Sequence, residues 1–323
     1  MKILLTGAAG FIGHHTVKYI LENTDWKITL LDRLDCSGNL NRLSDIGIKN
    51  SQFVYHDLKA EFNDQLCKQI GEHDYVIHMA AGTHVDRSIT DPLSFVMDNV
   101  VGTCNLLNYV RKVGCGKMIY FSTDEVFGPA PEGVEYKEWD RFKSGNPYAA
   151  TKAGAEELCV AFENTYKVPV MVTHTMNVFG ERQHPEKFIP STVAKVLKGD
   201  NVYIHSDRTK TKSGSRFYIH ADNVADAMLF LLNTGVSGQK YNIVGEKEVT
   251  NLQLAQDIAG ILKRPLNFEM VDFHSSRPGH DLRYALDGSK MKSMGWEPET
   301  SYEQSLENTV EWIAANKQWR EVA

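Results

Sequence analysis

The first half of the chain alternates short, continuously apolar runs with longer segments that have the spacing of amphipathic helices. The apolar runs predict strands at 2–6, 27–31, 52–55, 75–79, 117–122 and 168–173. Helical spacing predicts helices near 11–23, 60–71, 92–113 and 147–166. Because the strands are apolar throughout instead of alternating, both faces of their sheet must be covered. The pattern predicts an α/β fold with a doubly wound parallel sheet.

The pattern changes after about residue 174, where strand-like pieces become shorter and lie further apart. Strands are expected at 202–205, 216–219, 240–244 and 266–271, and helices near 187–198, 222–233, 250–263 and 301–315. We therefore expect a main domain over 1–173 and a smaller α/β lobe over 174–323, with some segments of the lobe returning to the main sheet.

Composition narrows the class of protein. The 323 residues include 35 Lys and Arg against 41 Asp and Glu, which gives a net charge of −6. Mild acidity argues against a nucleic-acid partner, and no apolar run is long enough to span a membrane. No His or Cys spacing suggests a metal site. The cysteines are scattered without a C-x-x-C pair, which favours reduced thiols and a cytoplasmic location: Cys36, Cys67, Cys104, Cys115 and Cys159.

A glycine-rich turn follows the first predicted strand and opens the first predicted helix. Its sequence is Thr6-Gly7-Ala8-Ala9-Gly10-Phe11-Ile12-Gly13. Glycines allow backbone N–H groups to approach a pyrophosphate, and the helix N-terminus adds partial positive charge. Asp32 follows 19 residues after Gly13, at the end of the second strand, where a carboxylate would accept hydrogen bonds from a ribose and repel a 2′-phosphate. The turn predicts a dinucleotide site for NAD; Arg33 leaves NADP open, and a purely structural turn is the alternative.

Tyr148 and Lys152 stand four residues apart on a predicted helix that Asn146-Pro147 opens. Asn is a good cap and Pro a good first-turn residue, and a spacing of four places both side chains on one face. A nearby ammonium and the positive helix end would favour the phenolate, which could then take a proton from an alcohol. Such a pair also occurs on helices without this role, so its weight comes from the neighbouring motifs.

A second group of polar residues ends the strand at 117–122. Thr123, Asp124 and Glu125 lie there, at the edge of the sheet where ligands of doubly wound folds bind. Thr123 could bind the hydroxyl that is oxidised. Two adjacent carboxyls in different environments could serve as an acid and a base. The alternative is a solvated Asp-Glu turn.

With these motifs the chain resembles the extended short-chain dehydrogenase/reductase family, and most closely its nucleotide-sugar 4,6-dehydratases. The resemblance covers nearly the whole chain. Besides the motifs above it includes Gly38-Asn39-Leu40, His78-Met79-Ala80-Ala81, His84-Val85-Asp86-Arg87-Ser88-Ile89, Asn177, Pro185-Glu186-Lys187-Phe188-Ile189-Pro190, Tyr241-Asn242 and Arg277-Pro278-Gly279-His280-Asp281. It implies a Rossmann-type main domain and a lobe that binds the nucleotide sugar, dTDP- or UDP-glucose above all.

The resemblance also implies a mechanism. Thr123 and Tyr148 would bind the 4-hydroxyl, and Tyr148 would take its proton while NAD⁺ takes hydride from C4. Glu125 would remove the C5 proton, and Asp124 would protonate the departing 6-hydroxyl. The hydride would then return to C6, so the net reaction is loss of water.

Further residues are assigned by position in the resemblance. Those expected to line the cofactor are Gly7, Gly10, Phe11, Ile12, Gly13, Asp32, Asp57, Leu58, Ala80, Ala81, Asn99, Tyr148 and Lys152. Those expected to contact the nucleotide sugar are Thr83, Asn177, Lys187, Phe188, Arg216, Asn242, Arg277 and His280. Arg216 stands one residue later than the usual arginine, and Ala81-Gly82-Thr83 departs from the commoner Ala-Glu-Ser. The helices at 92–113 and 147–166 resemble those of a homodimer interface.

Three alternatives stay open. A 4-epimerase of the same family would need Thr123, Tyr148 and Lys152 but not the carboxyls at 124 and 125. A dehydratase of other regiochemistry, by 5,6-elimination or with inversion at C5, would keep them. A cofactor-sensing binding protein on the same fold would need none of these catalytic groups. The nucleotide base (dTDP, UDP, GDP or CDP) and the hexose are not fixed by the sequence.

Overall fold

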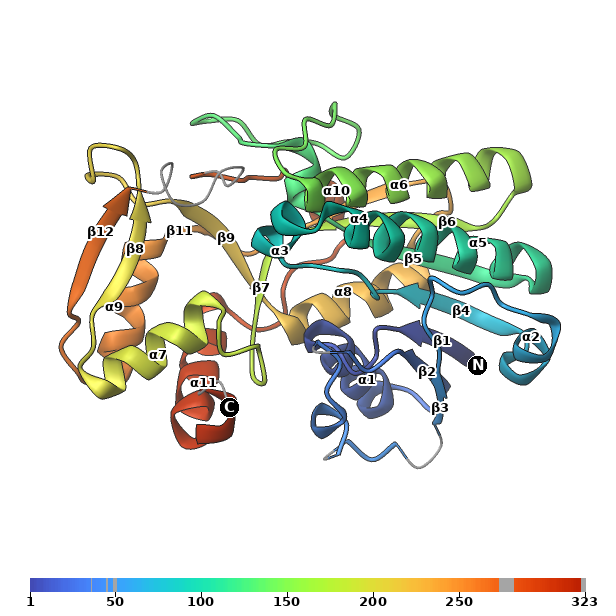
Figure 1. Cartoon of the computed structure of the whole chain (residues 1–323), viewed down its shortest axis with the longest axis horizontal. Coiled ribbons are helices and arrows are strands. Elements are labelled where there is room, and N and C mark those ends of the chain that lie inside the picture. The colour runs from blue at the N-terminus through green and yellow to red at the C-terminus, as the bar shows by residue number, and fades with distance from the viewer. Residues whose placement is uncertain (36, 45, 49–50, 273–281, 321–323) are drawn as a thin grey trace.

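The computed structural model describes residues 1–35, 37–44, 46–48, 51–272 and 282–320. Its centre is a seven-stranded sheet in the order β10-β6-β5-β4-β1-β2-β3, in which all pairings are parallel (Figure 1). The strands are β1 (Lys2–Thr6), β2 (Lys27–Asp32), β3 (Gln52–Tyr55), β4 (His73–His78), β5 (Cys115–Thr123), β6 (Val170–Thr175) and β10 (Lys240–Ile243). The predicted Rossmann-type, doubly wound α/β fold is confirmed.

Helices cover both faces of this sheet. One face packs against α1 (Phe11–Asn23) and α8 (Ala221–Thr234), and the other against α2 (Asp64–Ile70), α5 (Gly102–Val113) and α6 (Pro147–Tyr166). A short α10 (Ser289–Ser293) packs on β10. Among the described helices, none combines the length and the apolar character that crossing a membrane requires.

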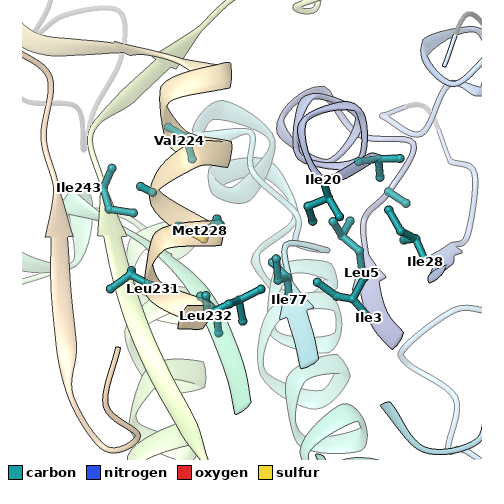
Figure 2. Close-up of a cluster of buried hydrophobic side chains, with 14 of the residues drawn as sticks. Ile3, Leu5, Ile20, Ile28, Ile77, Val224, Met228, Leu231, Leu232 and Ile243 are labelled. Atoms are coloured by element: carbon teal, nitrogen blue, oxygen red, sulfur yellow. The ribbon is translucent and has the colours of Figure 1, made fainter. Parts of the chain in front are cut away.

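Alternate residues of each central strand supply two separate cores. Ile3 and Leu5 of β1 and Ile77 of β4 belong to the core between the sheet and α1 and α8, which Figure 2 shows. Leu4 and Val76, their neighbours along the strands, belong to the core under α5 and α6. Full burial of such a side chain stabilises the fold by about 1.5–3 kcal/mol. The two cores explain why the strands read as continuous apolar runs.

The second lobe holds two small sheets and three helices. One sheet consists of β7 (Asn177–Phe179), β9 (Ser215–His220) and β11 (Glu248–Thr250), and the other pairs β8 (Val202–Ser206) with β12 (Phe268–Asp272). The helices are α7 (Phe188–Lys198), α9 (Asn251–Ile261) and α11 (Tyr302–Ala315), and they share one apolar core with β7, β9 and β11. Between the lobe's segments the chain returns to the main sheet through α8 and β10, as Figure 1 shows.

One predicted helix is wrong in detail. The segment 92–113 is α4 (Pro92–Phe95), a π-helical stretch η2 (Val96–Val101) and then α5. The wider turn accompanies Asn99, which is 1% exposed and bonds inward to Gly82 and Thr151. The pattern also missed α3 (Val85–Thr90), β7 and β11, because each is too short to show a period.

A buried ion pair joins α6 to the sheet. Glu156 is fully buried, and its Oε1 accepts from His174 Nε2 at 2.9 Å and Lys240 Nζ at 2.8 Å. Its Oε2 accepts from Ser122 Oγ at 2.9 Å. Burial alone would raise the pKa of Glu156, but His174 and Lys240 outweigh it and lower the pKa to about 2. The helix is therefore tied to β5, β6 and β10 at one point.

Replacing Glu156 with Gln is expected to lower the free energy of unfolding by about 3–5 kcal/mol, because the Lys240 ammonium would stay buried without its carboxylate. Urea unfolding at pH 7 measures the change. The pKa of Glu156 lies below its ordinary 4.5, so the wild-type advantage is present above pH 4.5 and is lost as the pH falls toward 2. Lys112→Met, which removes an exposed ion pair with Asp64, is the control and should change stability little. Equal effects of the two substitutions would contradict the role of Glu156.

Candidate active site

The carboxyl ends of β1, β2, β4 and β5 meet at one edge of the sheet because the strands are parallel. The order of the strands reverses at β1, which pairs with β2 on one side and β4 on the other. Ligands of doubly wound folds bind outside the strand ends at such a switch point. The predicted glycine turn, the end of β2 and the end of β5 all lie at this edge.

The glycine turn is held closely against the end of β4. Gly7 has φ +74°, and a Cβ there would lie 2.8 Å from the backbone nitrogen of Ala80. A Cβ on Gly13 would overlap the carbonyl oxygen of Gly7, so the first turn of α1 needs glycine at that point. Gly10 precedes α1 with no side-chain cap, and the first turn carries no acidic residue. The first N–H groups of α1, from Phe11 and Ile12, therefore lack an intrahelical acceptor and suit an anion.

Asp32 lies where the sequence predicts, at the end of β2 beside the glycine turn. It is 8% exposed, and its carboxylate accepts from the backbone of Ala9 and of Leu34, both at 2.9 Å. A Cβ on Gly38 would lie 2.7 Å from Asp32 Oδ1, so Gly38 closes over the carboxylate. Asp32 thus braces the turn and keeps a negative charge next to it.

Arg33, which left NADP open, is held by carboxylates. Its guanidinium donates to both oxygens of Asp98, at 2.5 and 2.8 Å, and its Nε donates to Asp35 at 2.8 Å. Asp57 lies 3.7 Å from Arg33 Nη1. The hydrogen bonds to Asp98 raise the pKa of Arg33. With its charge balanced in this way, Arg33 is poorly placed to take a 2′-phosphate, which favours NAD.

Two residues expected to line the cofactor also support the loop or the core. Asn99 accepts from Gly82 N at 2.7 Å and donates to Gly82 O at 3.0 Å and Thr151 Oγ1 at 2.9 Å. Its amide therefore fixes the loop that carries Ala80, Ala81 and Thr83. Leu58 is 7% exposed and packs in the core under α5. In this loop Ala80 and Ala81 are half-buried and Thr83 is exposed.

Thr123, Tyr148 and Lys152 converge where β5 ends and α6 begins. Thr123 is the last residue of β5, and it lies close enough to Tyr148 to lower the pKa of the phenol, against the larger effect of burial. Lys152 Nζ donates to the carbonyl of Phe121 at 2.6 Å and lies 4.2 Å from the centre of the Tyr120 ring. All three side chains are at least nine-tenths buried. The predicted grouping of the three residues is present.

Burial has the largest influence on the pKa values of both Tyr148 and Lys152. Burial raises the pKa of Tyr148, and the charge of Glu125 raises it further. Burial lowers the pKa of Lys152 to about 7. The ammonium of Lys152 donates to the carbonyl of Phe121.

The two adjacent carboxyls occupy different surroundings. Asp124 is 5% exposed; its Oδ1 accepts from Thr123 Oγ1 at 3.0 Å, and its buried Oδ2 has no hydrogen-bond partner among the described residues. Burial raises the pKa of Asp124 to about 6, although the charge of Arg216 opposes the shift. Glu125 Oε2 accepts from Asn146 Nδ2 at 2.9 Å. Asp124 is suited to donate a proton and Glu125 to accept one.

The lobe brings some of its predicted residues toward this edge. Arg216 Nη1 donates to the carbonyls of Ser215 and Leu282, both at 2.6 Å, and its charge acts on Asp124. Lys187 and Phe188 open α7, and Asn177 opens β7 with an exposed side chain. Arg277 and His280 lie outside the described residues.

The structure contradicts the expectation that Asn242 contacts the nucleotide sugar. Its side chain is fully buried on β10 and bonds to the carbonyls of Tyr136 and Asp287 and to His174 Nδ1, at 2.9 to 3.0 Å. These bonds occupy the amide, so Asn242 braces the sheet and does not face a substrate. Buried strand positions and ligand-facing ones cannot be told apart from a short motif.

The sequence also missed residues that support the site. Ser88 of α3 accepts from Tyr148 N at 3.1 Å, and Asn146 contacts Glu125 as well as capping α6. The only sequence signal for Asn146 was its preference for helix starts. No group of three or more His, Cys, Asp or Glu side chains in the described part of the chain could hold a metal ion.

Replacing Asp124 with Asn is expected to stabilise the protein at pH 7 by about 2–3 kcal/mol, because the buried carboxylate would no longer have to ionise. The pKa of Asp124 is raised above its ordinary 3.8, so the wild type keeps its full stability below pH 4 and loses it as the pH rises through 6. Urea unfolding at pH 4 and pH 7 measures the difference, which should vanish at pH 4.

Asp207→Asn is the control of opposite sign. The backbone of Lys212 and neighbouring donors lower the pKa of Asp207 to about 2, so its substitution should destabilise the protein at pH 7. A destabilised Asp124→Asn variant at pH 7 would contradict the raised pKa.

A model of the NAD dependent epimerase/dehydratase family matches residues 3–244. The dTDP-glucose 4,6-dehydratase of Salmonella typhimurium is 35% identical over 344 residues, which cover 99% of this chain and 94% of that protein. The low-salt glycan biosynthesis protein Agl12 of Haloferax volcanii is 36% identical over 314 residues, which cover 97% of this chain and 98% of that protein.

A solved structure agrees with these relatives. The dTDP-glucose 4,6-dehydratase DesIV of Streptomyces venezuelae, solved with NAD and TYD bound, has a TM-score of 0.90 at 32% identity and covers 99% of each chain. The predicted resemblance and the predicted cofactor NAD are confirmed at the level of the family. The chain belongs to the NAD dependent epimerase/dehydratase family.

Proposed function

We propose that this chain is a nucleotide-sugar 4,6-dehydratase, a lyase that converts dTDP- or UDP-glucose to the 4-keto-6-deoxy sugar. The observation that carries the proposal is the contrast between Asp124 and Glu125 beside Thr123 and Tyr148. A buried carboxyl with a pKa of about 6 can give up a proton, and a hydrogen-bonded carboxylate next to it can take one. Relatives named dTDP-glucose 4,6-dehydratase support the assignment over the full chain.

Each residue at the end of β5 and the start of α6 has its own role in the proposed reaction. Thr123 and Tyr148 hold the 4-hydroxyl, and Tyr148 accepts its proton. Glu125 takes the proton from C5, which the C4 carbonyl has made acidic. Asp124 gives a proton to the 6-hydroxyl, which leaves as water. NAD, when bound, would supply the hydride acceptor and return the hydride to C6, while Glu125 would return its proton to C5.

The chain's own residues fit NAD. The uncapped N-terminus of α1 would hold the pyrophosphate through Phe11 and Ile12, and Asp32 would accept from the adenosine ribose. Asp57 would lie at the adenine end. Lys152 is close enough to the end of β5 to bind the nicotinamide ribose in place of the Phe121 carbonyl. In the lobe, Lys187 and Arg216 would neutralise the substrate diphosphate, with Thr83, Asn177 and Phe188 nearby.

A 4-epimerase is the main alternative, and the acid–base pair argues against it. An epimerase uses Thr123, Tyr148 and Lys152 but has no step for a buried proton donor at Asp124. The cost of burying that carboxyl makes a chemical role the better explanation. A dehydratase of other regiochemistry keeps the pair and is separated by the product.

Incubating the chain with dTDP-, UDP-, GDP- and CDP-hexoses without added reductant should yield a product lighter by one water with at least one of them. Mass spectrometry measures the loss. Deuterium placed at C4 should reappear on the new methyl carbon, because the same hydride returns to C6. A product of unchanged mass would identify an epimerase, and deuterium missing from the methyl group would exclude 4,6-dehydration.

Glu125→Gln should slow water loss by about 10²–10⁴-fold and still allow oxidation at C4, because the amide cannot take the C5 proton. Reduced cofactor, measured by absorbance in single turnover, should therefore accumulate. Glu132→Gln, at an exposed loop carboxylate, is the control and should behave as wild type. Full dehydration by Glu125→Gln would show that another group is the base.

We also propose a homodimer, formed through α4, η2, α5 and α6, and a cytoplasmic location. Figure 1 shows α4, α5 and α6 side by side on one face of the sheet. Apolar side chains are exposed there, among them Leu93 at 68% and Met97 at 37%. The four described cysteines are free. A second copy of the chain packed against these helices would cover the apolar side chains that are exposed in a single chain.

The molar mass in solution should be twice the 36.4 kDa of one chain. Light scattering after gel filtration measures it. The double variant Leu93→Glu, Met97→Glu should shift the mass to that of one chain, because two carboxylates would be buried at the interface. Val236→Glu, at an apolar residue exposed elsewhere, should leave the mass unchanged. A wild-type monomer would rule out the dimer.

A further inference from the structure

Asn146 makes two hydrogen bonds to two different parts of the site. Its Oδ1 accepts from Ala149 N at 2.8 Å and so caps α6. Its Nδ2 donates to Glu125 Oε2 at 2.9 Å. The side chain is 7% exposed. One amide therefore joins the start of the helix that carries Tyr148 to the carboxylate assigned as the C5 base.

The orientation of this amide is set by its partners. A backbone N–H can only donate, so the oxygen of Asn146 must face Ala149. A carboxylate accepts, so the amide nitrogen is suited to face Glu125. Rotating the amide by half a turn would set oxygen against oxygen and nitrogen against nitrogen. Both contacts thus require the orientation that the structure has.

The segment before Asn146 is fastened to the turn that carries Glu125. That turn is the 3₁₀ helix η3 (Asp124–Phe127). Lys143 N donates to Val126 O at 2.9 Å, and Gly128, with φ +78°, has no space for a Cβ against the carbonyl of Lys143. Asn146 and Glu125 therefore belong to one closely packed unit, and their contact is not that of two mobile side chains.

We propose that Asn146 is a positioning residue that holds the carboxylate of Glu125 in place for removal of the C5 proton. The inference rests on the proposed function. Among the described residues, Tyr148 of α6 lies close enough to Glu125 for the charge of that carboxylate to raise the pKa of the phenol. Asn146 supplies a neutral hydrogen-bond donor to this carboxylate.

The substitution Asn146→Asp distinguishes the two roles of Asn146, which are capping α6 and donating a hydrogen bond to Glu125. Asp has the same shape and is an equally good cap, so α6 should keep its start. It places a carboxylate oxygen where the amide nitrogen faced Glu125, which repels the base. We expect water loss to slow by about 10²-fold, the effect of misplacing a reacting group by about 1 Å.

Single turnover with dTDP-glucose, or UDP-glucose if the wild type prefers it, tests this. In Asn146→Asp, oxidation at C4 should proceed and reduced cofactor should accumulate, while exchange of the C5 hydrogen with D₂O slows by the same factor as water loss. Asn146→Ser, which keeps a cap but is too short to donate to Glu125, should slow both by about tenfold or more. Neither variant should lower the thermal midpoint appreciably.

The matched control is Asn63→Asp. Asn63 caps α2 through the same kind of bond, to Leu66 N at 2.9 Å, but is exposed and outside the site. It should show wild-type rates. Wild-type water loss in Asn146→Asp, or parallel loss of C4 oxidation and of thermal stability, would overturn the proposal. A wild-type chain that releases no dehydrated product would instead overturn the proposed function.

Discussion

The carboxylate of Glu156 is the interaction on which the catalytic geometry depends. It lies one helical turn after Lys152 on α6 and bonds to side chains of β5, β6 and β10. The helix carries Tyr148 and Lys152, and β5 ends in Thr123. Because a buried charge is tolerated only when its partners are in place, the link permits one seating of α6 on the sheet. That position of α6 on the sheet fixes Tyr148 and Lys152 relative to Thr123.

The second constraint is the 3₁₀ turn that follows β5. Successive residues of such a helix point roughly 120° apart, so neighbours in sequence enter different surroundings. Asp124 turns into the protein, where burial raises its pKa to about 6, and Glu125 turns to the amide of Asn146. An acid and a base can therefore be made from adjacent carboxyls.

The sequence predicted the main sheet and its helices well because their burial leaves a clear apolar pattern. The strands are buried on both faces, and each helix is buried on one face. The helices at 11–23 and 147–166 have the predicted bounds, and the glycine turn, Asp32, Thr123, Tyr148 and Lys152 lie at the predicted edge. What it did not predict depends on contacts between distant segments. Asn242 and Asn99 are amides that bind other parts of the chain, and nothing in a local motif separates such an amide from one that faces a ligand.

The same limit applies to electrostatics. A spacing of four placed Lys152 beside Tyr148 correctly, but the direction of its ammonium depends on the carbonyl of Phe121, a contact from another element. Burial has the largest influence on the pKa of Tyr148, and it too depends on the surrounding elements.

The cofactor turn is also fastened to the second lobe. Arg42 donates to the carbonyl of Ala9 in the turn and to the carbonyl of Arg182 in the lobe, both at 3.1 Å. His15 of α1 bonds to the carbonyl of Glu181 in the lobe at 3.0 Å and, within the main domain, to Asp222 of α8 at 2.5 Å. A reaction that takes a hydride and returns it needs a cofactor that stays in place between the two transfers. Bonds that join both lobes beside the pyrophosphate turn resist its opening, so the fold suits a cofactor that is regenerated where it is bound instead of exchanged at each cycle.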